Sequence, residues 1–215
     1  MLSSRLYVPT RGYVWHETAT ALAPMKPIYV RCNTGVVDAR RIIVQAFLED
    51  PTAPDVLVMC DDDVVPGEEA GWVVSHVVQG RADVCAAVVP ICLEGTVLLP
   101  NVFIRDDSLP RGYKLSAELL RERGLQEVDA VGTGFIAIHR RVLTDRRMKD
   151  PFRTDFLNST GEDVFFCKRA KAARFGVFAD FDVWCDHHVE ISANALSNAY
   201  VTVINAALDE GDARV

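Results

Sequence analysis

Three consecutive carboxylates, Asp61, Asp62 and Asp63, directly follow the apolar run Val56–Cys60. Such a run is typical of a strand buried on both faces, and ligands of open parallel sheets bind beyond the carboxyl ends of the strands. Three neighbouring carboxylates repel one another unless a cation is present. If the chain stays extended, Asp61 and Asp63 point the same way and can hold a divalent ion or a ribose hydroxyl. The alternative is a solvated acidic turn, but the position between a buried strand and Pro66 favours a ligand site.

A second group of acids, Glu162 and Asp163, stands at the start of a predicted helix. Ser159 and Glu162 have the spacing of a capping box, and so do Thr160 and Asp163. We expect capping to occupy one of the two acids, namely Glu162 through Ser159. Asp163 is then free to act as a base or to position an acceptor hydroxyl.

Two adjacent histidines, His187 and His188, follow the short predicted strand at 183–185. A histidine at a strand end can be a metal ligand, and neutral imidazole suits Mn²⁺ or Zn²⁺ better than Ca²⁺. The alternative is a surface or capping histidine. The residues alone leave the choice between these two roles open.

A short glycine loop, Gly132-Thr133-Gly134, lies between two strand-like runs. A dinucleotide-binding glycine loop precedes a helix, whereas a strand pattern, Phe135–His139, follows here. The loop therefore either lines a ligand pocket, where side chains would block the approach of a ligand, or forms a bulge or tight bend.

The elements that position these residues alternate along the first 90 residues. Continuous apolar runs mark buried strands, and apolar residues at helical spacing mark helices. This alternation predicts a mostly parallel sheet with helices on both faces. The predicted strands are 5–9, 27–32, 55–60 and 83–89, and the predicted helices are 13–22, 39–47 and 67–79.

The pattern changes after residue 90, where antiparallel additions are expected. We predict strands within 97–105 and 127–139, a short helix over 114–123, a helix over 161–174 and short strands at 177–180 and 183–185. Gly176 is expected to end the longer helix in the left-handed conformation. A terminal helix is predicted over 192–208.

Composition restricts the class of protein. The 215 residues are 49% hydrophobic and 25% charged, which excludes general disorder. The net charge of −7 makes nucleic acid and anionic membranes poor default partners. The six cysteines include no CxxC pair, so a zinc ribbon is not expected. We expect the cysteines to be reduced thiols. The longest apolar stretch, 84–93, is about half a membrane span and contains a proline. We therefore expect a cytoplasmic chain without a membrane span.

The order of these features resembles the nucleotide-sugar-dependent glycosyltransferases of the GT-A fold, in particular the inverting family 2-like group. The resemblance covers about residues 5–190. It rests on five segments: Val8–Arg11, Asp61–Pro66, Val131–Arg140, Gly161–Ala170 and Asp180–His187.

The resemblance implies a role for each matching residue. Asp61 resembles the first acid of a DxD motif, which contacts the nucleotide or sugar, and Asp63 the second, which binds the metal. His187 resembles a further metal ligand, with His188 as the next candidate, and Asp163 the catalytic base. The remaining donor-binding positions implied are Pro9, Thr10, Arg11, Arg40, Asp62, Gly132, Thr133, Gly134 and Glu162. The match at Arg40 is incomplete, because related chains often have Asn in the place of Arg41.

The implied fold is an α/β GT-A domain over 1–215, with a Rossmann-like, mostly parallel sheet and a smaller antiparallel part on the acceptor side. Its nucleotide-binding half is about 1–90, its acceptor and catalytic half about 91–190, and its terminal helix 191–215. The implied reaction is a Mn²⁺- or Mg²⁺-dependent transfer of a sugar from a UDP- or GDP-sugar to a hydroxyl of a glycan, protein or small molecule. Inversion of the anomeric configuration is favoured, and retention stays open. Assembly into a homo-oligomer also stays open. A QxxRW motif is absent from the sequence, which favours a non-processive enzyme.

Two other functions fit parts of the sequence. Haloacid dehalogenase-type phosphatases also have DxDxV after a buried strand, as in Asp61–Val65. That motif normally follows the first strand, whereas two predicted strands precede it here. The second alternative is a nucleotide-sugar-binding protein without catalytic activity.

Overall fold

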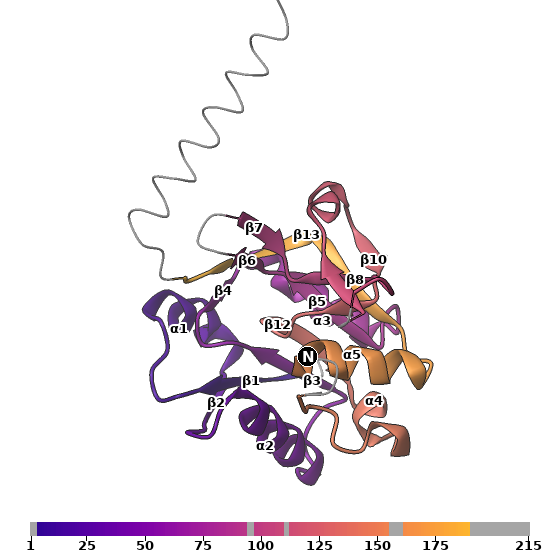
Figure 1. Cartoon of the computed structure of the whole chain (residues 1–215). Coiled ribbons are helices and arrows are strands. Elements are labelled where there is room, and N and C mark those ends of the chain that lie inside the picture. Colours follow the sequence, from indigo (N-terminus) through magenta and orange to yellow (C-terminus); the bar gives the residue numbers. More distant parts are fainter. Residues whose placement is uncertain (1–3, 94–96, 110–111, 155–160, 190–215) are drawn as a thin grey trace, which may run out of the picture.

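The alternating segments of the first 90 residues form the parallel part of a central sheet in the computed structural model (Figure 1). The structure describes residues 4–93, 97–109, 112–154 and 161–189. The elements of this first part are β1 (Ser4–Thr10), α1 (His16–Leu22), β2 (Ile28–Arg31), α2 (Val36–Glu49), β3 (Val56–Cys60), β4 (Val64–Pro66), α3 (Gly71–Val78) and β5 (Val84–Val88). They confirm the predicted alternation, although α1 begins three residues later than expected and a 3-10 turn, Glu68–Ala70, precedes α3.

The second part of the chain contributes strands to the same sheet. The strand order in this sheet is β10-β13-β5-β12-β3-β1-β2, and β4 pairs with β13. The additional strands are β10 (Leu125–Glu127), β12 (Phe135–His139) and β13 (Val177–His187). Strand β12 runs antiparallel between β3 and β5, so the strand that follows the glycine loop lies in the centre of the sheet. The sheet is mostly parallel because β1, β2, β3, β5 and β13 share one direction.

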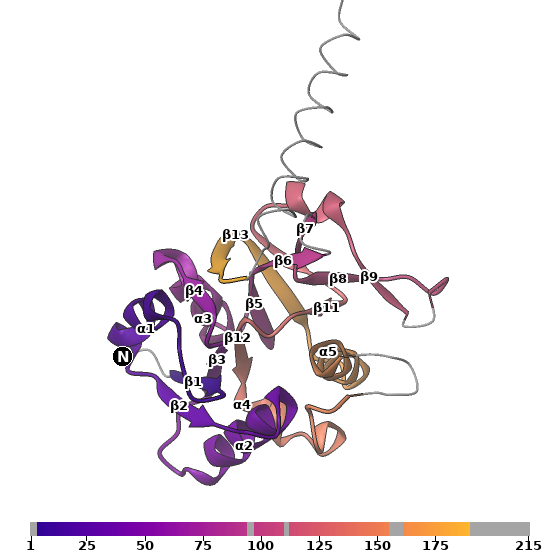
Figure 2. The ribbon, with the colours of Figure 1, turned by 60° about the vertical axis from the view of Figure 1, so that its left-hand side comes forward.

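Helices cover both faces of the sheet, because β3 and β5 are buried at every residue and present apolar side chains to both sides. One core joins the sheet to α2, α4 (Arg140–Thr144) and α5 (Glu162–Ala172), and the other joins it to α1 and α3. Figure 2 shows α1 and α3 on one side of the strands and α2, α4 and α5 on the other. The strands at the centre of the sheet are therefore covered by helices on both faces.

The antiparallel additions predicted after residue 90 are present. A hairpin of β6 (Pro90–Leu93) and β7 (Val97–Pro100) stands beside a small sheet of β11 (Ala130–Val131), β8 (Val102–Arg105) and β9 (Tyr113–Leu115). The predicted helix at 114–123 is a short 3-10 helix, Ala117–Arg121.

Two local predictions were wrong. The strands predicted at 177–180 and 183–185 are a single strand, β13, with an irregularity between Asp180 and Trp184 where it passes β5. Gly176 does not take the left-handed conformation; Arg174 does, with φ 67°, and the Gly176 N–H instead donates to Asp83. The predicted helix at 192–208 lies outside the described residues.

Five of the six cysteines are buried free thiols, and Cys92 is half-buried. Among the helices in the part of the chain that the structure describes, none is both long and apolar enough to cross a membrane.

Candidate functional site

Two adjoining pockets lie beyond the carboxyl ends of β1 and β3. The first pocket is lined by Pro9, Thr10, Arg11, Cys32, Gly35, Val36, Ala39, Asp61, Asp62 and Asp63. The second pocket is lined by Val36, Arg40, Asp61, Val64, Val89, Ile91, Asn101, Gly132, Thr133, Gly134, Glu162, Asp163 and His187. Val36 and Asp61 line both. Each residue that the sequence predicted for the site lines at least one of the two pockets, including residues far apart along the chain.

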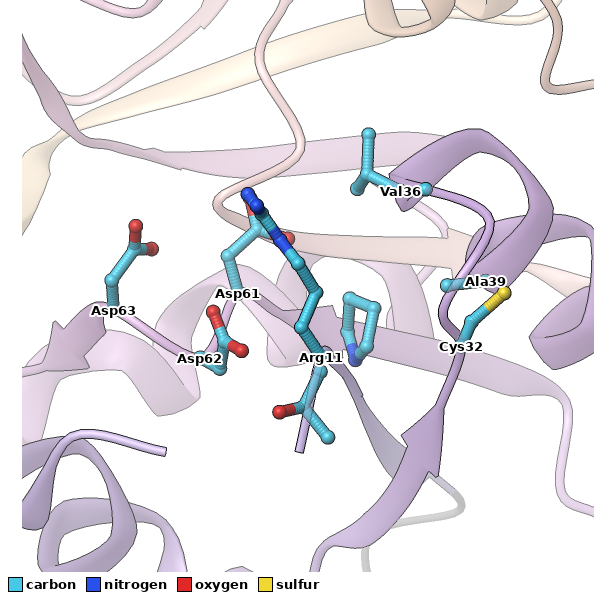
Figure 3. A pocket seen from close by; sticks show the side chains of 10 residues that line it. Arg11, Cys32, Val36, Ala39, Asp61, Asp62 and Asp63 are labelled. Carbon is cyan, nitrogen blue, oxygen red and sulfur yellow. The ribbon is translucent and has the colours of Figure 1, made fainter. Parts of the chain in front are cut away.

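The first pocket opens between the end of β1 and the start of α2. In Figure 3, Arg11 and the three aspartates stand on one side of it, and Cys32, Val36 and Ala39 on the other. Gly35 precedes α2 at φ 126°, a backbone conformation that side chains other than glycine rarely adopt. The pocket thus combines a cation, a cluster of carboxylates and an apolar wall.

The condition of an extended chain at the three aspartates is not met. The Val64 N–H donates to the Asp61 carbonyl (3.3 Å), so a turn follows β3. The three carboxylates consequently have different neighbours: Asp61 binds Arg40, Asp62 lines the first pocket with Thr10, and Asp63 faces His187. Asp61 and Asp63 therefore do not point at one common ion.

Arg40 on α2 joins the first aspartate to the helix that carries the second pair of acids. Its guanidinium donates to both Asp61 carboxylate oxygens, at 2.8 and 3.0 Å, and also pairs with Glu162. The Arg40 side chain is only 3% exposed. Burial lowers the pKa of Arg40, but the charges of Asp61 and Glu162 outweigh it and hold the pKa above its ordinary value. The pairing depends on tertiary contacts, and local sequence spacing gives no signal for it.

Asp63 and His187 meet across the ends of β3 and β13. The His187 Nε2 lies 3.6 Å from the nearer Asp63 carboxylate oxygen. The other ring nitrogen, Nδ1, is 2.8 Å from the Pro90 carbonyl oxygen and donates to it, which leaves Nε2 turned toward Asp63. This arrangement is typical of a histidine that binds metal through Nε2.

The residues present fit a divalent cation held in part by its substrate. Among the described residues, no group of three or more His, Cys, Asp or Glu is placed to hold a metal. Asp63 and His187 would supply two ligands to such an ion, and oxygens of a bound ligand and water would have to complete its coordination shell. A carboxylate and an imidazole together suit Mn²⁺ better than Ca²⁺.

His188 lies apart from this pair. Its ring stacks on Trp15, with ring centroids 4.5 Å apart, and its Nε2 is 3.7 Å from Glu17. Only its backbone N–H contacts the acidic turn, donating to the Asp63 carbonyl. The side chain that faces Asp63 is thus that of His187.

The two acids at the start of α5 differ from the predicted capping box. The N-cap of α5 is Gly161, and Glu162 is the first helical residue, so Glu162 does not stand three positions after the cap. Ser159 and Thr160 lie outside the described residues. Glu162 binds Arg40, and Asp163 accepts from the Val164 N–H at 2.7 Å.

Asp163 has the properties of a weak base in a cleft. Burial, with a further contribution from the negative charge of Glu162, raises the pKa of Asp163 to about 6. A carboxylate with a pKa near neutrality is suited to accept a proton. Its position on the second pocket leaves it accessible to a ligand.

The glycine loop forms a wall of the second pocket. A Cβ at Gly132 would lie 2.8 Å from Asn101 Nδ2, and one at Gly134 would lie 3.0 Å from a Val89 methyl group. The Asp61 N–H also donates to the Gly134 carbonyl (2.9 Å), which ties the loop to the acidic turn. The sequence left open whether the glycine loop lines a pocket or forms a bulge or tight bend. In the structure it lines a pocket. Asn101 itself was missed, because one asparagine after a proline has no distinctive spacing.

Comparison with known proteins identifies the fold. No protein-family model and no curated protein sequence matches the chain. Among solved structures, A197 from STIV superposes with a TM-score of 0.63 at 21% identity, covering 87% of this chain and 86% of that one. GalNAc-T7, crystallised with UDP, GalNAc and Mn²⁺, superposes with a TM-score of 0.63 at 10% identity. This match covers 89% of the present chain but only 45% of the GalNAc-T7 chain. The fold is thus GT-A-like, as the sequence predicted.

Proposed function

We propose that the protein is a metal-dependent glycosyltransferase that moves a sugar from a nucleoside-diphosphate sugar to an acceptor hydroxyl. The observation that carries the proposal is the meeting of Asp63, which lines the first pocket, with His187, which lines the second pocket together with Asp163. The GT-A-like fold supports it, and so does the UDP and Mn²⁺ bound by GalNAc-T7, which makes UDP the first nucleotide to test.

The donor occupies both pockets in this proposal. The nucleoside lies in the first pocket against Pro9, Thr10 and Arg11, and Arg11 offsets part of the diphosphate charge. The sugar lies in the second pocket against the glycine loop. Asp63 and His187 would hold Mn²⁺ or Mg²⁺, and the ion would supply positive charge that stabilises the departing diphosphate. Asp62 borders the nucleoside beside Thr10, and Glu162 fixes Arg40.

The chemistry assigned to the chain is proton transfer at Asp163. An acceptor hydroxyl oxygen forms a bond to the anomeric carbon while the bond from that carbon to the diphosphate oxygen breaks. The hydroxyl proton passes to the Asp163 carboxylate, and the nucleoside diphosphate leaves with the bonding electron pair. Attack from the side opposite to the leaving group inverts the anomeric configuration.

The experiment that tests the proposal is a thermal-shift screen of UDP-, GDP-, CDP- and dTDP-sugars, each with Mn²⁺ and with EDTA. We expect one nucleotide, UDP first, to raise the melting temperature only with the metal present. Failure of every donor to stabilise the protein would contradict the proposal. Stabilisation without donor turnover, in the presence of an acceptor panel, would favour the binding protein without catalytic activity.

The phosphatase alternative is less consistent with the observed fold. In the phosphatases the motif normally follows the first strand. Here the acidic turn follows β3, the third strand of the chain, and is followed by β4, which pairs with β13. Assay of a generic aryl phosphate with Mg²⁺ separates the two enzymes. We expect no phosphate release, and turnover of the aryl phosphate would favour the phosphatase.

A further inference from the structure

Asn101, at the end of the β6–β7 hairpin, is held rigidly at the wall of the second pocket. Its backbone N–H donates to the Val89 carbonyl (2.9 Å), and its backbone carbonyl accepts from Gly132 (2.7 Å). The side-chain Oδ1 accepts from the Val89 N–H at 2.8 Å. This last bond fixes the orientation of the amide, because only the amide oxygen can accept a hydrogen bond. The NH₂ group must therefore point away from Val89.

The NH₂ group of Asn101 has hydrogens to donate and no described partner to receive them. Asn101 is only 3% exposed, yet its Nδ2 is not among the fully enclosed polar atoms without a partner. Its accessible side therefore opens into the second pocket, which Asn101 lines. Leaving a nearly buried donor unpaired is costly, so the position favours a ligand oxygen.

The surroundings of this donor indicate the charge of the ligand. Glu162 and Asp163 border the same pocket, and Arg40, its cation, is already paired with Asp61 and Glu162. The cation proposed at Asp63 and His187 is balanced by the diphosphate of the donor. An anionic group elsewhere on the ligand would therefore meet carboxylates without a free cation to balance it. The rest of the wall includes Val64, Val89 and Ile91. A neutral, hydroxyl-bearing ring fits this combination of one amide donor and apolar side chains.

We propose that Asn101 Nδ2 donates to a hydroxyl or other uncharged oxygen of the donor sugar, and that the second pocket selects neutral sugars over uronic acids. This inference rests on the proposed function, because it takes the ligand of the second pocket to be the sugar of a nucleotide donor. Asn101 is then a specificity-determining residue.

The test is Asn101→Asp, which keeps the oxygen that accepts from Val89 and replaces the free NH₂ donor with a carboxylate oxygen that cannot donate when ionised. Calorimetry with Mn²⁺ measures the affinity for UDP, UDP-glucose, UDP-N-acetylgalactosamine, UDP-glucosamine and UDP-glucuronate. For the unmodified protein we expect the neutral donors to bind at least about tenfold more tightly than UDP-glucuronate. Asn101→Asp should weaken the neutral donors about tenfold, the effect of one lost hydrogen bond, and leave UDP unchanged. It should also shift the preference toward UDP-glucosamine, whose ammonium group can donate to the new carboxylate.

The exposed Asn33 provides the matched control, because Asn33→Asp makes the same chemical change outside the second pocket. It should leave the ranking of the sugars unaltered. If UDP binds but Asn101→Asp retains the sugar ranking and affinities of the unmodified protein, the inference is overturned while the proposed function stands. If Asn101→Asp does not fold, the unmodified protein decides: equal affinities for UDP-glucose and UDP-glucuronate overturn the inference. If UDP and all its sugars fail to bind the unmodified protein, the proposed function fails, and the inference fails with it.

Discussion

His187 Nε2 lies 3.6 Å from the Asp63 carboxylate, although the two residues are 124 positions apart in the sequence. The Pro90 carbonyl holds the other ring nitrogen, so the imidazole is oriented before any ligand arrives. Such preorientation reduces the free-energy cost of binding a cation. The pair therefore ties β13 to the acidic turn after β3 at the position where the proposed diphosphate would lie.

The first prediction concerns this pair. Asp63→Ala and His187→Ala should each lower the Mn²⁺-dependent affinity for UDP by about 10- to 100-fold, because each removes one of two protein ligands. His188→Gln is the matched control, because its ring stacks on Trp15 and does not face Asp63. Calorimetry with Mn²⁺ and with EDTA measures the effect. Undiminished affinity for UDP in EDTA would count against a metal-dependent donor site.

The second prediction places the nucleotide. Cys32 lines the first pocket, and a hydrogen bond with Thr34 lowers the pKa of its thiol, which favours the reactive thiolate. Bound UDP with Mn²⁺ should therefore slow alkylation of Cys32, as followed by peptide mass spectrometry. Cys92 is half-buried and lines neither pocket, so its rate should not change. Equal protection of both thiols would indicate a general stabilisation instead of occupancy of the first pocket.

The third prediction concerns Arg40. Arg40→Met keeps much of the buried volume but leaves the Asp61 and Glu162 carboxylates without their shared cation. Breaking such a buried pairing should lower the free energy of unfolding by about 3 kcal/mol. Arg41→Met removes a neighbouring arginine whose side chain is 51% exposed, and it should cost less than about 0.5 kcal/mol. Urea denaturation measures the free energy of unfolding of both variants. Equal losses would show that the buried Arg40 pairing contributes no more to stability than the exposed Arg41.

The fourth prediction uses the raised pKa of Asp163. Its folded pKa of about 6 exceeds the ordinary value of 3.8, so the protonated form is favoured in the folded state. The stability contributed by this protonation is complete below the ordinary value and is lost as pH rises through 6. Asp163→Asn does not titrate, so its advantage over the unmodified protein should be about 2–3 kcal/mol larger at pH 7.5 than at pH 4. Urea denaturation at both pH values tests this, and a difference that does not change with pH would refute it.

The sequence predicted the parallel core and the residues that line the site, but not how some of them interact. Runs such as Val56–Cys60 identify strands because a strand that is buried on both faces needs apolar side chains at every position, and this pattern can be read from the sequence. The antiparallel direction of Phe135–His139 is not encoded in that pattern, because a buried strand is apolar in either direction. The Arg40–Glu162 pair and the site role of Asn101 arise only when distant segments fold together. The capping box failed for a related reason: the pairing with Arg40 takes the carboxylate that capping was expected to use.

The most direct test of the central claim is the rate of donor turnover by Asp163→Asn, measured beside its affinity for UDP. This substitution keeps the shape of the side chain and removes the proposed base, whereas Glu162→Gln alters the neighbouring acid, which binds Arg40. The account predicts that Asp163→Asn lowers kcat by about 10² to 10⁴ and leaves UDP affinity within about twofold. Glu162→Gln should mainly lower stability, by about 1 kcal/mol. Near-normal turnover by Asp163→Asn would contradict the assignment of Asp163 as the base and favour a retaining reaction.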